Sequence, residues 1–297
     1  KKLNQDLKKR LLENYKSILL EPRFDLRVNN SINRDRVIKL LLNNGIFAKK
    51  SIFSPLCVTI LKRIQEKKIN AIKNNFFEIQ DEGSQIAALL CDARPGMQVV
   101  DMCAGAGGKT LVMAAQMQNK GRVLALDSDA ERLERGGERM RRAGIHNIER
   151  KHVGDSWGTK RWRGKFDRVV IDAPCSGSGT WRRQVDARWR CSSDDLARYT
   201  SLQAQLLDKG RAMVMPGGRI IYITCSVLAS EGPLLIERFL HKSPDIELAD
   251  IYGIWADTIG KFGGGVCPPL EEGLLQLLPR RDGTDGFFIA IMQTRLR

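Results

Sequence analysis

From residue 82 to the end of the chain, strand-like and helix-like patterns alternate. Such alternation is typical of a doubly wound α/β domain, in which helices cover both faces of a mostly parallel sheet. The expected strands are residues 98–102, 122–126, 148–153, 166–171 and 219–224, and the expected helices are residues 83–91, 109–117, the segment after Asp129, and 231–240. Apolar runs at residues 274–278 and 287–292 flank a glycine-containing turn. They predict a hairpin that closes the sheet.

The first 80 residues differ from the rest in composition. They hold ten of the twelve asparagines, and lysine outnumbers arginine there by 12 to 6, whereas arginine outnumbers lysine by 23 to 8 in the remainder. We place a module boundary near residues 77–81, which divides the chain into an N-terminal module, residues 1–80, and a second domain, residues 81–297.

The N-terminal module is predicted to be small and mainly helical. Apolar side chains recur at helical spacing within residues 36–42 and 57–72, and residues 43–45 form a plausible helix stop between them. Residues 24–28 alternate like a short strand. A further helical pattern is formed by Leu7, Leu11, Leu12, Tyr15 and Leu19.

The chain is strongly basic. Lys and Arg outnumber Asp and Glu by 49 to 34 among the 297 residues, which gives a net charge of +15. A field of this size attracts polyanions and steers their approach, so nucleic acid is the first partner to expect. The alternative is a basic protein whose charge serves only its solubility.

The seven cysteines contain no Cys-x-x-Cys pair. Their odd number and scatter argue against a disulfide framework and against the usual zinc spacings, and favour a reducing cytoplasm. No apolar run approaches the roughly 20 residues of a membrane span, and the charged start is not followed by a signal-peptide core. We therefore expect a cytoplasmic monomer without a metal or a membrane partner. Structural roles are expected for Cys57, Cys91, Cys191, Cys267, His146, His152 and His241.

A glycine-rich turn follows the first expected strand of the second domain and opens a helix. It reads Asp-Met-Cys-Ala-Gly-Ala-Gly-Gly-Lys-Thr over residues 101–110. Glycines let a ligand lie against the backbone, and a helix N-terminus offers free N–H groups. A phosphate loop would need glycine at position 103, which is Cys, and a dinucleotide fingerprint would need glycine at position 110, which is Thr. Both nucleotide patterns therefore miss by one residue.

Two acids follow the next two expected strands. Asp127 can accept hydrogen bonds from two ribose hydroxyls, and Asp155 is placed to meet an adenine edge. Each acid alone is more often a helix cap or a turn former. Together with the glycine turn they predict S-adenosylmethionine, a ribose-bearing cofactor without a phosphate clamp, whose positive charge suits carboxylates. The expected cofactor-binding residues are Cys103, Ala104, Gly105, Ala106, Gly107, Gly108, Lys109, Asp127, Asp155 and Asp172.

Two later strands end in cysteines. One runs into Asp172-Ala-Pro-Cys175, where Pro174 stops the strand because it has no N–H to donate, and the other runs into Cys225. Ligands bind at the carboxyl ends of the strands in an open parallel sheet. We therefore expect Asp172, Cys175 and Cys225 to share one site. The alternative is an ordinary strand-to-loop turn with a buried, inert cysteine.

Four ordered motifs make the chain similar to the RNA 5-methylcytosine methyltransferases, the family of the bacterial Sun/Fmu-type 16S rRNA enzymes and their eukaryotic relatives. The motifs are residues 101–110, 172–179, 224–226 and 285–290, and residues 77–85 resemble the family's entry into its catalytic domain. The family's usual glycine turn reads Cys-Ala-Ala-Pro-Gly-Gly-Lys, so Gly105-Ala106 depart from it. The likeness covers about residues 77–297 and implies a Rossmann-like, S-adenosylmethionine-dependent methyltransferase domain. The N-terminal module, which the resemblance makes an RNA-binding or pre-catalytic unit, is only weakly similar.

The resemblance also implies the roles of the site residues. C5 of cytosine is a poor nucleophile until a thiolate adds at C6, and this addition needs a hydrogen bond or a proton at N3. By this likeness Cys225 is the nucleophile, Asp172 is the N3 partner and Cys175 serves the release of the product. The target base must leave its stack, so the RNA should be single-stranded or splayed open.

Residues 181–190 interleave cations with aromatic rings and are the candidate RNA contact, although a packed helix with a charged face explains them equally well. The expected substrate is rRNA. Two alternatives stay open: a tRNA-directed enzyme, and an RNA-binding ribosome assembly factor whose methylation is dispensable. The pair of thiols favours an enzyme, because a scaffold needs neither.

Overall fold

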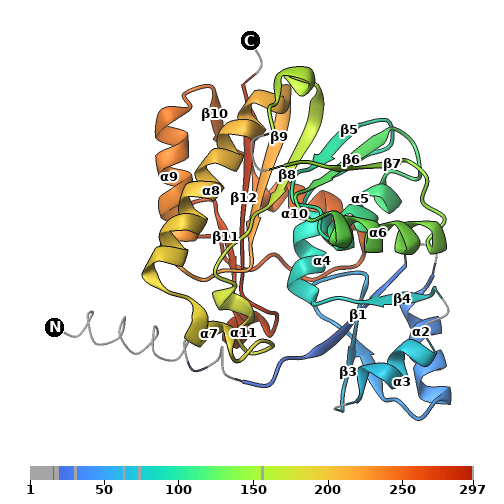
Figure 1. Cartoon of the computed structure of the whole chain (residues 1–297). Coiled ribbons are helices and arrows are strands. Elements are labelled where there is room, and N and C mark those ends of the chain that lie inside the picture. Colours follow the sequence, from blue (N-terminus) through green and yellow to red (C-terminus); the bar gives the residue numbers. More distant parts are fainter. Residues whose placement is uncertain are drawn as a thin grey trace.

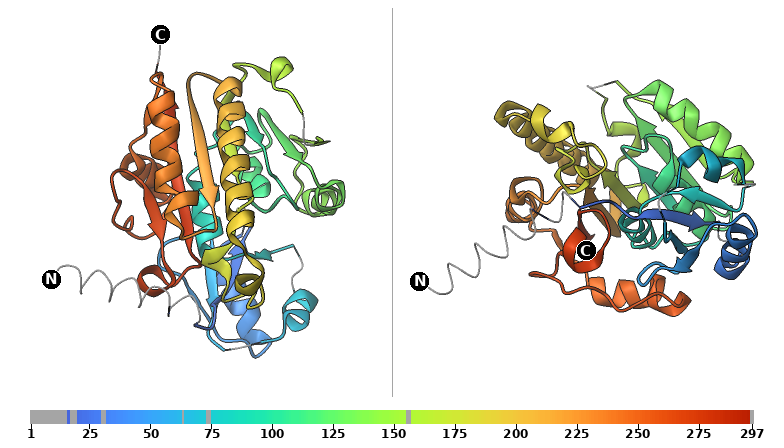
Figure 2. Two further views of the ribbon diagram at one scale, coloured as in Figure 1. Left: turned by 60° about the vertical axis from the view of Figure 1, so that its left-hand side comes forward. Right: turned by 90° about the horizontal axis from the view of Figure 1, so that it is seen from below.

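A computed structural model describes Lys16 and residues 20–29, 32–62, 64–72, 75–154 and 157–295. Two sheets organise these residues (Figure 1). The smaller sheet lies within residues 24–79 and the larger one within residues 98–294, and the views of Figure 2 separate the two. The helical pattern from Leu7 to Leu19 falls outside the described residues, and so does Asp155.

The larger sheet has eight strands. Along the sheet they run β10 (Ile246–Leu248), β12 (Phe287–Thr294), β9 (Val214–Thr224), β8 (Phe166–Asp172), β5 (Gln98–Asp101), β6 (Arg122–Asp127) and β7 (Ile148–His152), with β11 (Leu275–Leu277) paired to β12. The five strands from β9 to β7 are parallel. The pairs of β12 with β9, β10 and β11 are antiparallel. This confirms the Rossmann-like sheet and its closing hairpin.

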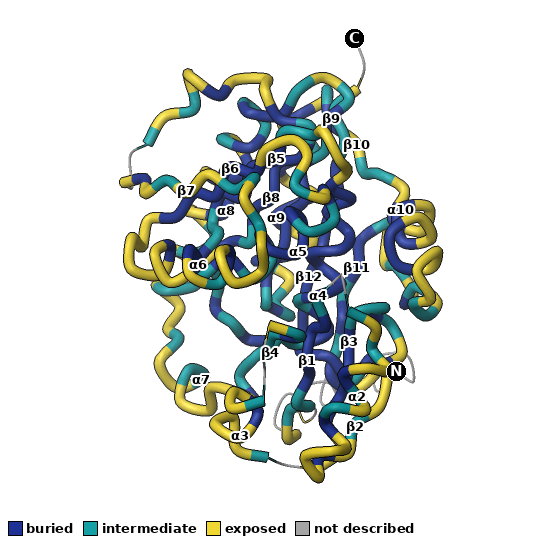
Figure 3. The backbone as a smooth tube through the Cα atoms, turned by 90° about the vertical axis from the view of Figure 1, so that its right-hand side faces the viewer, coloured by how far each residue is buried: buried dark blue, intermediate teal, exposed yellow. Residues whose placement is uncertain are grey.

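Helices cover both faces of this sheet because its buried strands carry apolar side chains alternately on either side. Val99, Val170 and Ile221 pack on one face with α4 (Glu82–Leu89), α5 (Gly108–Gln116) and α10 (Ile251–Thr258). Their neighbours Val100 and Val169 pack on the other face with α8 (Ser193–Met213) and α9 (Pro233–Lys242). Figure 3 shows the buried strands in dark blue inside the more exposed helices. The result is a three-layer domain.

Most of the expected elements of the second domain are present within a residue or two of their bounds, including α6 (Ala130–Arg142). The helix α8, for which the sequence suggested no element, spans 21 residues and begins with a capping box at Ser192 and Asp195. Two short helices, α7 (Ala187–Arg190) and α11 (Pro279–Asp282), and four 3₁₀ turns complete the domain. The turns are η1 (Lys160–Trp162), η2 (Ser178–Thr180), η3 (Ala229–Glu231) and η4 (Gly260–Phe262).

The N-terminal module is not mainly helical in its described part, so that prediction was wrong. It contains an antiparallel sheet of β2 (Ala48–Lys50), β3 (Cys57–Ile60), β1 (Phe24–Val28) and β4 (Phe77–Ile79), with α2 (Arg34–Asn43) and α3 (Glu66–Ala71). The error lies at residues 57–60, which form a strand buried throughout. A fully buried strand has no alternation, so its apolar run cannot be distinguished from helix by spacing.

The two sheets are joined through a buried carboxylate. Glu82, at the start of α4, accepts hydrogen bonds from the backbone N–H groups of Phe53 and Ser54, at 2.9 and 2.8 Å, and from the Ser51 hydroxyl. Asp25 of β1 accepts a bond from the Glu82 N–H at 3.3 Å. Buried carboxylates of this kind are tolerated only when they are hydrogen-bonded. The contacts therefore hold the N-terminal module against the larger domain.

Candidate active site at the carboxyl edge of the larger sheet

Three loops meet at the carboxyl ends of the central strands. They follow β5, β8 and β9, which are neighbours in the sheet, and they contain the glycine turn, residues 172–179, and Cys225. The parallel register aligns Asp101 with Val170, and Asp172 with Ile223, so the three loops start at the same edge. The sheet topology thus brings together the motifs that lie far apart in the sequence.

The glycine turn is built for close approach. Gly105 and Gly107 have φ angles of +54° and +78°, in the left-handed region that favours glycine. A Cβ atom on Gly107 would lie 2.8 Å from Cε of Met140 in α6. Gly107 is the N-cap residue of α5 and has no side chain that could cap the helix. The first N–H groups of α5 therefore lack a capping hydrogen bond from a side chain at this position.

The predicted Asp127 and a second acid, Asp101, hold this turn. Oδ2 of Asp127 accepts a hydrogen bond from the Gly105 N–H at 2.6 Å, and its Oδ1 accepts one from the Asp129 N–H at 2.8 Å. Asp101 is buried and accepts a bond from the Thr110 hydroxyl at 2.7 Å through Oδ2, while its Oδ1 has no partner. Burial raises the pKa of Asp101 to about 7. The turn thus carries one buried carboxylate oxygen that is not hydrogen-bonded among the described residues.

The two predicted thiols lie in hydrogen-bonding contact. Sγ of Cys175 is 3.4 Å from Sγ of Cys225, and both residues are partly buried. Beside them the partly buried ammonium of Lys109, at the start of α5, donates to Oδ2 of Asp172 at 2.6 Å. Asp172, Cys175 and Cys225 therefore share one site with a lysine that comes from the glycine turn.

The surroundings make the two thiols unequal. The hydrogen bond with Cys175 lowers the pKa of Cys225, and the nearby Lys109 adds to this against the opposing effects of burial and Asp172. The same hydrogen bond, burial and the charges of Cys225 and Glu231 raise the pKa of Cys175 well above its ordinary value. Burial likewise raises the pKa of Cys103 in the glycine turn. Cys225 is the thiol that ionises most readily of the three.

A buried acid that sequence reasoning missed anchors the loop of Cys175. Glu231, at the end of η3, accepts hydrogen bonds from the Ser176 N–H at 2.8 Å, from the Ser176 hydroxyl, and from Nε2 of Gln203 at 3.1 Å. Gln203 of α8 also donates to the carbonyl of Pro174 at 2.8 Å. In the sequence Glu231 looks like an ordinary acid near the start of a helix, so no local pattern distinguishes it.

Backbone hydrogen bonds to two other segments also hold the Cys175 loop. The Gly179 N–H donates to the Cys225 carbonyl at 2.9 Å, and the Gly179 carbonyl accepts from the Gly286 N–H at 2.9 Å. A Cβ atom on Gly179 would lie only 2.1 Å from the Gly286 carbonyl oxygen. This contact explains why the closing motif around residue 286 accompanies the two cysteine motifs.

The candidate RNA contact at residues 181–190 splits into two parts. Arg182 and Arg183 pair with Asp285, and Arg183 also pairs with Asp81, so these two cations are used within the fold. Arg188 lies over the ring of Trp189 at 4.8 Å, and 77% of Trp189 is exposed. The prediction of an RNA contact can therefore hold only for the outer part of the segment.

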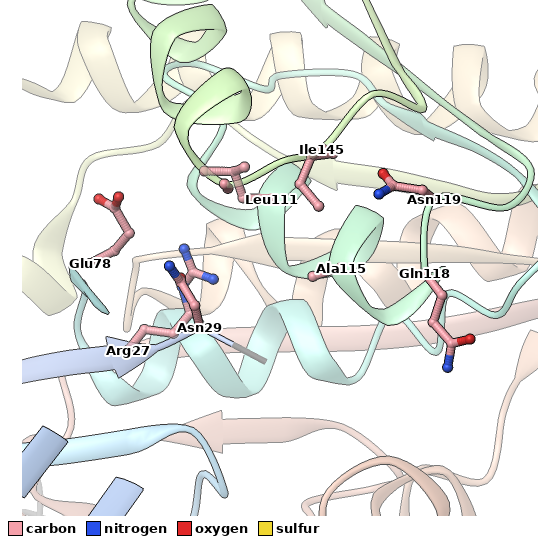
Figure 4. A pocket seen from close by; sticks show the side chains of 9 residues that line it. Arg27, Asn29, Glu78, Leu111, Ala115, Gln118, Asn119 and Ile145 are labelled. Atoms are coloured by element: carbon pink, nitrogen blue, oxygen red, sulfur yellow. The ribbon is translucent and has the colours of Figure 1, made fainter. Parts of the chain in front are cut away.

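A separate cavity of about 180 Å³ lies between the N-terminal sheet and α5. Figure 4 shows Arg27 and Glu78 on one side of it and Leu111, Ala115 and Ile145 on the other. Its lining contains no residue of the thiol site or the glycine turn. The described residues contain no group of three or more His, Cys, Asp or Glu side chains that could hold a metal ion, and none of their helices is long and apolar enough to cross a membrane.

The fold is that of the Rossmann-like methyltransferases. A methyltransferase homologue from Pyrococcus horikoshii has a TM-score of 0.75 and 26% identity, covering 94% of this chain and 88% of that one. NSun6 from the same organism has a TM-score of 0.80 over 97% of this chain and 94% of its own, and its 17% identity shows the fold alone.

The 16S rRNA methyltransferase RsmB/F family matches residues 88–293, and the chain belongs to this family. It is 34% identical over 272 residues, 91% of its length, to ribosomal RNA small subunit methyltransferase B of Pseudomonas syringae pv. tomato. A probable enzyme of the same name from Bacillus subtilis is 31% identical over 93% of the chain. The chain spans 59% and 61% of these two relatives, respectively.

Proposed function

We propose that the chain methylates C5 of cytosine in small-subunit rRNA, with S-adenosylmethionine as the methyl donor and through a covalent bond to Cys225. The observation that carries this proposal is the thiol pair, 3.4 Å apart, next to the Lys109–Asp172 ion pair. Cytosine C5 chemistry requires a nucleophile for C6, a proton source for N3 and a base that removes the C5 proton, and these four side chains can supply all three. Membership of the RsmB/F family and the names of the relatives support the same reaction and the same RNA.

The glycine turn fits S-adenosylmethionine. Its left-handed glycines and uncapped helix start leave the backbone open to a ligand, and its acids are hydrogen-bond acceptors of the kind that ribose hydroxyls need. Asp101 has a free buried oxygen, and the oxygens of Asp127 have lone pairs beyond the two backbone bonds that they accept. We assign cofactor binding to Cys103, Ala104, Gly105, Ala106, Gly107, Gly108, Lys109, Asp127, Asp155 and Asp172. When bound, the cofactor supplies an electrophilic methyl group.

Addition to the base begins at Cys225. Its thiolate forms a bond to C6, the electrons of the C5–C6 double bond form a C4–C5 double bond, and those of the N3–C4 double bond move onto N3, which takes up a proton. We assign delivery of this proton to Asp172, because Lys109 donates to its carboxylate and can replace the proton passed on. Addition thus leaves C5 electron-rich, Lys109 neutral and N3 protonated.

Release reverses this addition after C5 has been methylated. The C5 proton leaves to a base, its electrons restore the C5–C6 double bond, and the Cys225–C6 bond breaks to return the thiolate. The N3 proton returns through Asp172 to Lys109. We assign the release step to Cys175, whose sulfur is in contact with Cys225. Its thiol first loses its proton to solvent, and the resulting thiolate, a strong base because of the raised pKa, accepts the C5 proton.

The RNA is proposed to present an unpaired cytidine to this edge. Trp189 and Arg188 are our candidates for contacts with neighbouring nucleotides, since exposed rings and guanidinium groups stack on bases. We further propose that residues 1–80 act with residues 81–297 as a separate RNA-binding or pre-catalytic module. The net charge of +15 supports contacts with several phosphates.

Incubation of the purified protein with S-adenosylmethionine and unmodified 16S rRNA tests the proposal, with nucleoside mass spectrometry as the measurement. We expect 5-methylcytidine to form in the rRNA and not in unmodified tRNA assayed in parallel. Formation in tRNA alone would support the tRNA-directed alternative. No methylation of either RNA, with intact RNA binding, would support an assembly factor.

A further inference from the structure

Glu231 touches neither the base nor the cofactor in the proposed reaction, yet it is fully buried beside the thiols. Its carboxylate accepts three hydrogen bonds, two of them from Ser176, the residue that follows Cys175. Tyr222 donates to its backbone carbonyl at 2.9 Å, which fixes η3 above the sheet. A charge buried this deeply acts strongly on its neighbours because little solvent screens it.

The charges around the thiol pair are arranged asymmetrically. Glu231 acts on Cys175 from the side of η3, whereas Lys109 acts on Cys225 from the start of α5. Asp172 opposes the effect of Lys109 on Cys225 but is itself paired with that lysine at 2.6 Å. The buried anion thus binds the residue that follows Cys175, whereas the charge of Lys109 lowers the pKa of Cys225.

We propose that Glu231 is a positioning residue that fixes the direction of the hydrogen bond between the thiols, so that Cys175 donates and Cys225 accepts as the thiolate. The Ser176 bonds set the place of the Cys175 sulfur, and the carboxylate charge keeps the proton on that sulfur. Glu231 therefore selects which of two adjacent thiols is the nucleophile. The inference rests on the proposed function, because only that function makes Cys225 the nucleophile. The ionisation of the two thiols can nevertheless be measured without RNA or cofactor.

Alkylation of the whole protein by iodoacetamide tests this order, with the two cysteine peptides quantified separately by mass spectrometry between about pH 6 and pH 9. In the unmodified protein we expect Cys225 to react at least about tenfold faster than Cys175, because one unit of pKa is a tenfold change in the thiolate ratio. Glu231→Gln removes the charge at nearly constant shape and should reduce this preference by about tenfold or more.

Two further variants separate charge from packing. Glu231→Asp keeps the charge and should retain most of the preference for Cys225, even if the shorter side chain lowers stability. Glu237→Gln makes the same chemical change at an exposed position of the neighbouring helix and should leave the preference unchanged. If Glu231→Gln keeps the normal preference, or if the Asp and Gln variants lose it equally, the proposal is overturned.

The donor role of Cys175 can be tested without changing Glu231, should the Gln variant fail to fold. Cys175→Ser retains a hydroxyl donor and should leave the alkylation midpoint of Cys225 close to normal, whereas Cys175→Ala should move it to higher pH. Equal midpoints in the two variants would overturn the proposed direction of the bond. Loss of methylation with a normal alkylation order would instead count against the proposed function alone.

Discussion

Two loops at the same edge of the sheet are held in different ways. The glycine turn after β5 is held by elements that follow it directly in the sequence, through Asp127 of β6 and the contact of Gly107 with α6. The Cys175 loop after β8 is held by Glu231, Gln203 and Gly286, which lie 29 to 107 residues further along the chain than the loop residues they bind. The cofactor side of the site is therefore nearly local, whereas the thiol side depends on the completed fold.

The largest effect should come from the two thiols. Cys225→Ala should abolish methylation and leave no covalent complex with RNA, because the bond to C6 cannot form. Cys175→Ala should still add to the base and accept the methyl group, and then accumulate a protein–RNA adduct that survives a denaturing gel. An adduct trapped by Cys225→Ala instead would reverse the two assignments.

The free energy of unfolding should depend on pH because of the buried Asp101 in the glycine turn. A carboxyl whose pKa is raised on folding binds its proton more tightly in the folded state, so its contribution to stability is complete below about pH 4 and is lost as the pH rises to about 7. Asp101→Asn should reduce the change in the free energy of unfolding between about pH 4 and pH 7 by up to about 4 kcal/mol. Denaturant unfolding at several pH values measures it, with the exposed Asp208→Asn as the control. Parallel curves for Asp101→Asn and the parent protein would contradict the buried charge.

Alanine at one glycine of each loop sharpens the contrast between them. Gly179→Ala places its Cβ against the Gly286 backbone, which cannot rotate away, and should destabilise the fold by about 3 kcal/mol or more. Gly105→Ala meets only the end of the flexible Arg132 side chain, 3.1 Å away, and should cost about 1 to 2 kcal/mol for its positive φ. Equal unfolding free energies for the two variants would show that the thiol loop tolerates movement.

A further expected effect, confined to one ligand, is on binding at the glycine turn. Asp127→Ala should weaken binding of S-adenosylmethionine by about 10- to 100-fold, since hydrogen bonds to a charged group contribute about 1.5 to 3 kcal/mol. Binding of RNA should change little, because Asp127 lies on the cofactor side. Calorimetry with each ligand separates the two, and an equal loss of both affinities in a folded variant would place this acid in a different role.

Much of the second domain is readable in the sequence because its elements have regular spacing and clear ends. Its strands and hairpin were predictable from apolar runs, and the meeting of Asp172, Cys175 and Cys225 followed from parallel strands ending at one edge. In the N-terminal module β1 was predicted, but β3 was missed because it is buried throughout. The helix α8 was missed although Ser192 and Asp195 cap its start.

By itself the sequence determined the types of the reactive residues and the edge at which they gather, since strand ends follow from local patterns and parallel strands end at the same edge. Only the tertiary structure decided which cations form ion pairs within the fold, and which acid acts on which thiol. Arg182 and Arg183, for example, both pair with Asp285. Burial and long-range hydrogen bonds set these properties. They arise between residues such as Ser176 and Glu231, 55 positions apart, whose proximity no local spacing encodes.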